Sequence, residues 1–173
     1  MGVAENIREI KQELPEGITL VAVSKFHPAE MIAEAYAAGQ TCFGESRVQE
    51  LAQKVPVLPV EIRWNFIGHL QTNKIKKVLG RASLIQSVDS EHLLAAIERE
   101  AAKAGLVQNI LLEVNIGGEE SKSGVSPEQL WPLLDAAAAQ EHLRVCGLMA
   151  IPPVNDDDAQ NRAYLCLLYT SPS

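Results

Sequence analysis

The chain has 173 residues, of which 47% are hydrophobic and 21% charged, proportions typical of a folded domain that needs no disulfide or metal to stabilise its core. Its formal net charge of −7 argues against nucleic acid as a partner, because phosphate binding requires a positive surface. No apolar run is long enough to span a membrane, and the three cysteines have no metal-ligand spacing, so we expect a cytoplasmic protein without a metal site.

Six short apolar runs predict strands, and they span residues 18–24, 41–45, 62–67, 83–88, 109–115 and 143–149. A helical pattern precedes the first run and another follows each run, beginning near residues 2, 28, 46, 72, 90, 126 and 156. Cys42 and Cys146 fall within two of these apolar runs, so we expect both side chains to be buried.

Capping residues mark several of the predicted helix ends. Ser46 and Ser126 each stand three residues before a glutamine, which is the spacing of a capping box. Ser90 is expected to cap a helix that ends at Gly105. These signals place the starts of three helices directly after predicted strands or their loops.

The regular alternation of strands and helices predicts a parallel sheet covered by helices. Both an open doubly wound sheet and a (β/α)8 barrel have this alternation. Short connections before the strands and longer ones after them favour the barrel, whose chemistry lies at the carboxyl ends of its strands. A full barrel needs eight units in roughly 250 residues, and six are present, so the chain is expected to contain an incomplete barrel.

Lys25 stands at the end of the first predicted strand, just before the proline that opens a helix. If the strand buries it, burial lowers the pKa of the ammonium and favours the neutral amine, which can form a Schiff base with a carbonyl compound. The alternative interpretation is that Lys25 extends its ammonium from the strand end into solvent. The stretch alone leaves both interpretations open.

Other polar residues also follow strands and would meet at the mouth of a barrel. His69 has the chemistry of a general base, although a histidine in a loop is more often solvated or structural. Glu45 and Asp89 have the chemistry of a carboxylate pair, but the sequence does not show that they approach each other. The glycine-rich loop 117–124 is a poor phosphate loop, because it contains two carboxylates and no glycine directly before Lys122.

The order of several motifs resembles that of one family. Its members carry a Val-Ser-Lys strand end, a Phe-Gly-Glu strand end and a segment similar to Trp-Asn-Phe-Ile-Gly-His-Leu-Gln. In this chain the matching segments are 21–25, 43–50, 64–74, 87–89, 114–116, 120–124 and 147–152. On these motifs, residues 1–164 resemble the pyridoxal phosphate homeostasis proteins, which are related to the barrel domain of the alanine racemases.

The resemblance implies a (β/α)8 barrel that binds pyridoxal 5′-phosphate (PLP) through an internal aldimine on Lys25. It further implies that Asn65, Ser87, Asn115 and Met149 contact the cofactor from the strand ends. The family acts in vitamin B6 homeostasis without robust catalytic turnover, so the resemblance implies a cytoplasmic, monomeric PLP carrier. Partners of such a carrier would be PLP itself and PLP-dependent apoenzymes.

Two other functions remain open at this point. One is a PLP-dependent amino-acid racemase or decarboxylase, although racemisation needs acid–base groups on both faces of the cofactor, and the tyrosines here are not at strand ends. The other is a Schiff-base barrel without PLP, in which Lys25 reacts with a sugar or keto acid, as in an aldolase.

The chain also departs from the family pattern. Ser46 stands where many members have asparagine, and Asn65 stands where a histidine is usual, which puts the cofactor contact at position 65 in doubt. In the family, the last two strands bind the phosphate and the pyridine nitrogen, and those segments are expected to lie beyond residue 173. Residues 165–173 break the preceding helical pattern, and we expect them to be a non-native tail.

Overall fold

The structure, a computed structural model, describes residues 2–119, 121–154 and 157–166. A six-stranded parallel sheet forms its centre, and each strand pairs with the next along the chain. The strands are β1 (Ala22–Val23), β2 (Cys42–Glu45), β3 (Arg63–Phe66), β4 (Leu84–Val88), β5 (Gln108–Glu113) and β6 (Leu143–Met149). The helices are α1 (Val3–Glu13), α2 (Ala29–Ala37), α3 (Val48–Lys54), α4 (Ile75–Val78), α5 (Glu91–Ala104), α6 (Leu130–Ala138) and α7 (Asp158–Cys166). Three short 3₁₀ turns adjoin them, at Val55–Val57, Thr72–Lys74 and Pro127–Gln129.

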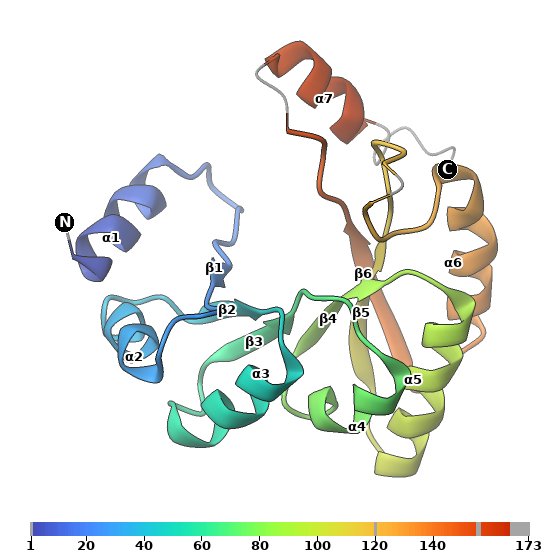
Figure 1. Cartoon of the computed structure of the whole chain (residues 1–173), viewed down its shortest axis with the longest axis horizontal. Coiled ribbons are helices and arrows are strands. Elements are labelled where there is room, and N and C mark those ends of the chain that lie inside the picture. The colour runs from blue at the N-terminus through green and yellow to red at the C-terminus, as the bar shows by residue number, and fades with distance from the viewer. Residues whose placement is uncertain (1, 120, 155–156, 167–173) are drawn as a thin grey trace.

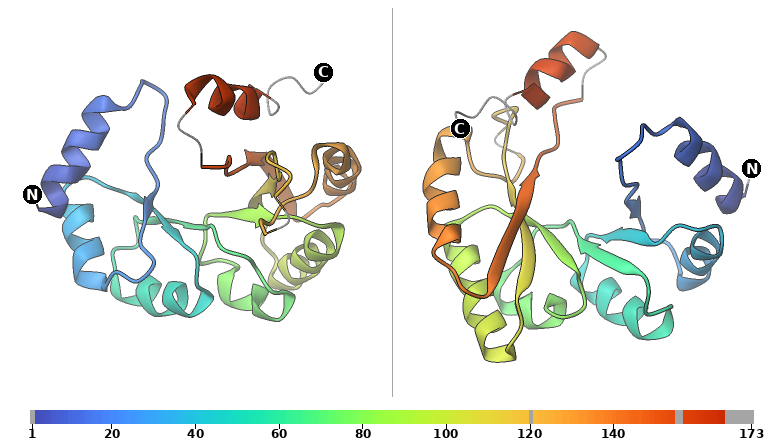
Figure 2. Two further views of the ribbon diagram at one scale, coloured as in Figure 1. Left: turned by 45° about the horizontal axis from the view of Figure 1, so that its top comes forward. Right: turned by 180° about the vertical axis from the view of Figure 1, so that it is seen from behind.

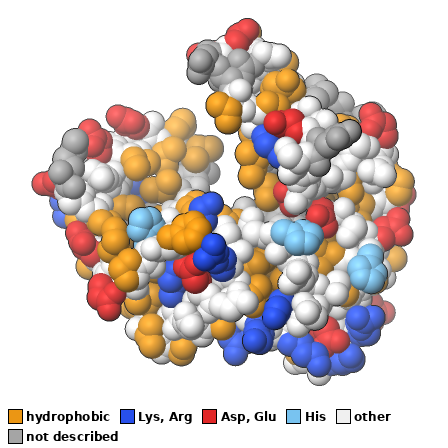
Figure 3. Space-filling view, in the orientation of Figure 1, with side chains coloured by type: hydrophobic (Ala, Val, Ile, Leu, Met, Phe, Trp, Pro, Cys, Tyr) orange, Lys and Arg blue, Asp and Glu red, His pale blue; other side chains and the backbone are white. Residues whose placement is uncertain are grey.

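The sheet curves like part of a barrel wall (Figures 1 and 2). Helices α2 to α6 cover its convex side, while α1 stands beside β1 at one end and α7 follows β6 at the other. Among the described residues β1 and β6 each pair with one strand, so the wall is open between them, and Figure 3 shows a deep notch there. The predicted barrel-type α/β fold is confirmed, with six strands in place of the eight of a complete barrel.

The hydrophobic core fills the space between the convex side of the sheet and its helices. Phe66, Ile85 and Ile110 lie on successive strands and are fully buried, with exposed fractions of 0%. They belong to one apolar cluster with Leu51 of α3 and Ile75 of α4. This packing positions the strands, and their carboxyl ends therefore share one rim, as in any parallel barrel wall.

The two edge strands differ from the prediction. The sequence predicts a first strand over 18–24, but only Ala22 and Val23 pair, because β1 has a single neighbouring strand to hold it extended. Cys42 on the inner strand β2 is buried as predicted, whereas the prediction for Cys146 is wrong, since its side chain is exposed. Cys146 lies on the edge strand β6, where alternate residues are uncovered.

The helix caps are partly as predicted. Ser90 accepts a hydrogen bond from the Leu93 amide at 3.3 Å, Gly105 ends α5 with φ of 64°, and Ser126 forms its capping box. The predicted cap at Ser46 is wrong, because α3 begins only after Arg47. The chain at Ser46 packs closely on Gly68, the second residue after β3: a Cβ atom at Gly68 would lie 2.1 Å from the Ser46 carbonyl oxygen.

The remaining sequence predictions concern the end of the chain and its setting. Residues 167–173 of the predicted tail lie outside the described residues, and the division at residue 164 stays a prediction. In the part of the chain that the structure describes, no helix is both long enough and apolar enough to cross a bilayer.

Candidate functional site

Lys25 lies in a turn directly after β1, at the rim formed by the carboxyl ends of the strands. Its side chain is exposed, so of the two interpretations left open by the sequence, the one in which Lys25 extends into solvent agrees with the structure. Strand β1 ends two residues earlier and is an edge strand, which leaves nothing to enclose the side chain. No described residue forms a hydrogen bond or an ion pair with the Lys25 amine, which is therefore accessible to a small molecule.

The neighbouring Ser24 is buried, unlike Lys25. Its hydroxyl donates a hydrogen bond to Glu45 Oε1 at 2.8 Å, close to the convex side where α3 packs. Side chains alternate along an extended chain, so Val23 lies on the opposite, concave side. The 49% exposure of Val23 agrees with that placement.

A buried ion pair holds the backbone just before Lys25. The Lys54 ammonium, at the end of α3, lies 2.5 Å from Glu45 Oε1 and donates a hydrogen bond to the Ser24 carbonyl oxygen at 2.9 Å. Glu45 is 0% exposed, and its other oxygen, Oε2, has no hydrogen-bond partner among the described residues. The charge of Glu45 is therefore compensated by Lys54.

The backbone just after Lys25 is held by the same helix. Phe26 donates its N–H to Glu50 Oε2 at 3.0 Å, and Glu50 also accepts from Lys54 at 2.8 Å. The hydrogen bond from Lys54, helped by that of Phe26 and by the charges of Lys54 and Arg47, keeps the pKa of Glu50 below its ordinary value against the effect of partial burial.

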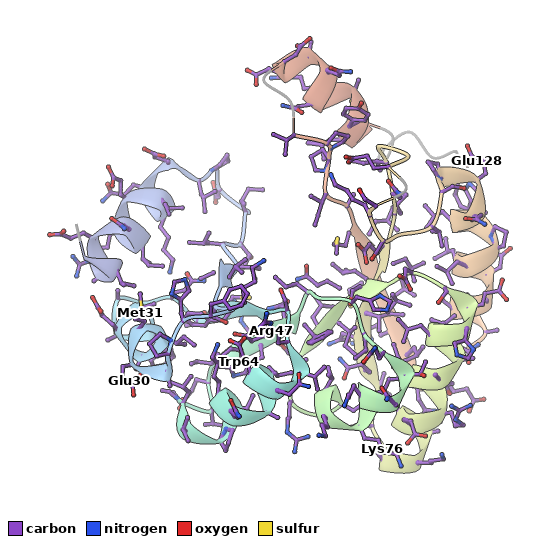
Figure 4. The ribbon with its side chains drawn as sticks, viewed as in Figure 1. Glu30, Met31, Arg47, Trp64, Lys76 and Glu128 are labelled. Atoms are coloured by element: carbon purple, nitrogen blue, oxygen red, sulfur yellow. The ribbon has the colours of Figure 1, made fainter. Side chains whose placement is uncertain are left out.

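Phe26 itself has a φ of 66°, which is unusual for a residue other than glycine. The guanidinium of Arg47, labelled in Figure 4, stacks over its ring at 4.3 Å from the ring centre. We call the contacts of Ser24, Phe26, Glu45, Glu50 and Lys54 the turn clamp. It holds the chain on both sides of Lys25 and leaves the Lys25 amine free.

Two of the predicted contact residues already have their polar groups engaged. Asn65 on β3 is 4% exposed; its amide donates to Cys42 Sγ at 3.0 Å and its oxygen accepts from Gln86 at 2.9 Å. Ser87 on β4 is 1% exposed and donates to the Gly68 carbonyl at 2.6 Å. Both residues support the wall of the site from within the sheet.

The other two predicted contact residues lie at the rim. Asn115, just after β5, bonds the loop that follows: its amide donates to the Glu119 carbonyl at 2.8 Å and its oxygen accepts from the Glu119 N–H at 3.2 Å. Met149 ends β6, is partly buried, and pairs in register with Glu113 at the end of β5. Lys25, Asn115 and Met149 therefore share the rim, while Asn65 and Ser87 lie just below it.

The structure separates Glu45 from Asp89, which the sequence had left as a potential pair. Glu45 is bound by Lys54, whereas the Asp89 carboxylate faces His69, with 3.8 Å between Oδ2 and Nδ1.

The charge of Asp89 also raises the pKa of Glu113, a residue that the sequence analysis did not identify. The signal was available: Glu113 is a carboxylate inside an apolar run, at a position where a strand side chain faces the concave side.

Glu113 is 8% exposed, and burial raises the pKa of its carboxyl. The charge of Asp89 raises the pKa further, and His69 lowers it by a smaller amount. A carboxyl with a raised pKa resists ionisation, and in the folded chain it binds its proton more tightly than in the unfolded chain. The free energy of unfolding therefore falls as the pH rises above about 4.5, the ordinary pKa, and through the folded pKa.

We expect the Glu113→Gln variant to lose this pH dependence. Glutamine is nearly isosteric and stays neutral, so the variant should gain stability relative to the parent chain as the pH rises above 4.5 and show no gain below 4.5. Urea denaturation at a series of pH values measures the difference. Glu30→Gln, at an exposed position of α2, is the matched control, and an equal gain in that variant would contradict the prediction.

Comparisons with known proteins bear on this rim. The alanine racemase N-terminal domain family matches residues 2–167 of the chain. The chain is 42% identical over 146 residues to a pyridoxal phosphate homeostasis protein from Aquifex aeolicus, covering 84% of this chain and 64% of that protein. It is 39% identical to one from Pseudomonas aeruginosa, over 94% of this chain and 73% of that protein. The chain thus spans about two thirds of the length of such relatives.

Solved structures have the same fold. PipY from Synechococcus elongatus, solved without PLP, superposes with a TM-score of 0.91 at 35% identity and covers 97% of this chain and 79% of its own. A second PipY structure, described as having PLP bound, gives a TM-score of 0.86 at 34% identity, with the same coverage. Alanine racemase from E. faecalis, at 18% identity and a TM-score of 0.73 over 96% of this chain and 48% of its own, shares the fold.

Proposed function

The chain belongs to the family of the pyridoxal phosphate homeostasis proteins, which have the fold of the alanine racemase N-terminal domain, and on this basis we propose that it binds PLP as a Schiff base on Lys25. The observation that carries the proposal is the turn clamp. It ties the charged end of Lys54 into buried contacts, fixes the backbone around Lys25, and leaves the Lys25 amine exposed at the rim. The bound PLP in the PipY structure supports the choice of cofactor.

The residues of the site fit the aldehyde end of PLP. When bound, PLP supplies an aldehyde that condenses with a primary amine and releases water. Lys25 offers that amine, and the clamp limits the directions in which it can point. We further propose that Asn115 and Met149 contact the cofactor from the rim, and that Asn65 and Ser87 support the wall beneath it.

The proposed role is that of a PLP carrier in vitamin B6 homeostasis, without robust turnover. The names of the related proteins support the homeostatic role. In this proposal the carrier is a cytoplasmic monomer that exchanges PLP with PLP-dependent apoenzymes. An exposed Lys25 amine suits such exchange, because water could reach the linkage and release the aldehyde, or another amine could take the aldehyde over and free Lys25.

Reductive trapping tests the proposal. The chain would be incubated with equimolar PLP, reduced with borohydride, digested, and mapped by mass spectrometry. We expect the phosphopyridoxyl group on Lys25, and little on Lys54, whose ammonium is buried by Glu45 and Glu50. Lys76, with a side chain 76% exposed, reports unspecific labelling. Equal labelling of Lys25 and Lys76 would contradict a built site at Lys25, and an unlabelled chain would contradict PLP binding through a lysine.

A further inference from the structure

A cavity of about 200 Å³ lies at the carboxyl ends of β3 and β5, and none of the residues that line it belongs to the turn clamp. Its apolar walls come from Ile67, Val114 and Ile151. Its polar lining residues are His69, Glu113, Asn115, Lys122 and Ser123. A cavity of this size is smaller than the pockets of roughly 300–1,000 Å³ that hold drug-sized ligands, so it suits a molecule of only a few carbon atoms.

Glu113 is a buried carboxylate in this cavity that lacks a partner among the described residues. It is 8% exposed, it lines the cavity, and no described residue donates a hydrogen bond to its carboxylate. A buried carboxylate without a donor is costly and attracts a cation. Glu113 therefore marks where the charged end of a ligand would lie.

The cations near Glu113 are already engaged elsewhere. The Lys122 ammonium lies 2.5 Å from Glu119 Oε2 and donates to the Pro152 carbonyl at 3.3 Å. His69 faces Asp89 across 3.8 Å. Glu113 is thus left with no cation of its own, and the surrounding carboxylates favour a positively charged ligand over an anion.

The residues that line the cavity suit an organic cation better than a metal ion. The described residues contain no group of three or more His, Cys, Asp or Glu side chains that could hold a metal ion. Apolar walls beside a single carboxylate suit an organic cation, whose ammonium pairs with the carboxylate while its carbon atoms contact the walls. We propose that this cavity binds the ammonium group of a small primary amine through Glu113.

Two classes of small molecule carry such an ammonium group, the simple alkylamines and the α-amino acids. An α-amino acid adds a carboxylate, which could accept a hydrogen bond from Ser123 or Lys122 in the cavity lining. The proposal goes beyond PLP binding. The cavity shares Asn115 with the proposed PLP contacts, but neither Lys25 nor any residue of the turn clamp lines it. The test of the proposal is therefore made on the chain without PLP.

Isothermal titration calorimetry with propylamine, L-alanine and propionate tests the proposal on the parent chain, Glu113→Gln and Glu30→Gln. We expect propylamine to bind with a Kd in roughly the millimolar range, to bind at least about tenfold more weakly to Glu113→Gln, and to bind Glu30→Gln like the parent. Propionate, which lacks the ammonium, should not bind. Binding of L-alanine more tightly than propylamine would identify amino acids as the ligand class, and weaker binding would identify alkylamines.

The contradicting results are equally definite. If propylamine binds the parent chain and Glu113→Gln alike, or does not bind the parent at all, the proposal is wrong. Circular dichroism melts of each variant establish that it is folded. Failure here with successful trapping on Lys25 would leave the PLP proposal standing, and the reverse outcome would leave the amine site standing.

Discussion

Substituting Lys25 with alanine is expected to abolish the visible absorbance band that the parent chain develops on titration with PLP. The band reports a Schiff base, and in the proposed site Lys25 supplies the amine, which the turn clamp leaves exposed at the rim. We expect less than roughly a tenth of the parent amplitude at the same PLP concentration, since the remaining exposed lysines react without a prepared site.

Two matched variants make this result specific. Lys25→Arg keeps the positive charge but has no amine that can condense with an aldehyde, so it should lose the band as well. Lys76→Ala removes an exposed lysine on the outer, convex side (Figure 4) and should keep the band in full. A band of parent size in Lys25→Ala would show that another lysine carries the cofactor.

Replacing Lys54 with methionine is expected to lower the free energy of unfolding by about 3–5 kcal/mol, the range for breaking a buried ion pair by removing one partner. The Lys54 side chain is 9% exposed and that of Glu45 is 0% exposed, so solvent screens the pair little. Without Lys54, the Glu45 carboxylate keeps only the hydrogen bond from Ser24. Urea denaturation at neutral pH measures the loss.

A double variant shows whether the loss comes from the uncompensated charge. Glu45→Gln removes that charge while keeping the shape of the side chain, so Lys54→Met combined with Glu45→Gln should recover a large part of the loss. Lys54→Arg, which keeps a cation at the same place, should cost less than Lys54→Met. Strictly additive losses in the double variant would contradict the buried pair.

The order of the strands could be read from the sequence because each apolar run is short and each is followed by a helical pattern. The rim position of Lys25 follows from that order alone, since parallel strands end on the same side. The exposure of Lys25 could not be read in the same way. It depends on β1 being an edge strand with two paired residues, which is a property of the assembled sheet.

The clamp shows a second limit of sequence reasoning. Lys54 looks like an ordinary charged residue at the end of an amphipathic helix, and such residues are usually exposed. Its burial results from the packing of α3 against β2, which places its ammonium between Glu45 and the Ser24 carbonyl. The misplaced cap at Ser46 has a similar cause, since the close backbone contact with Gly68 joins residues that are distant in sequence.

The left-handed backbone of Phe26 restricts the conformations of the turn that carries Lys25. A residue with a Cβ atom in this region of backbone angles loses roughly 1–2 kcal/mol of stability, whereas glycine does not. Glycine at position 26 would relieve that strain, but it would also remove the ring beneath Arg47 and let the turn explore many more backbone angles. The Lys25 amine would then occupy more positions, and in the proposed site fewer of its encounters with an aldehyde would have the geometry needed for reaction. The strained phenylalanine thus lowers the stability of the fold slightly and in return restricts the backbone that carries Lys25.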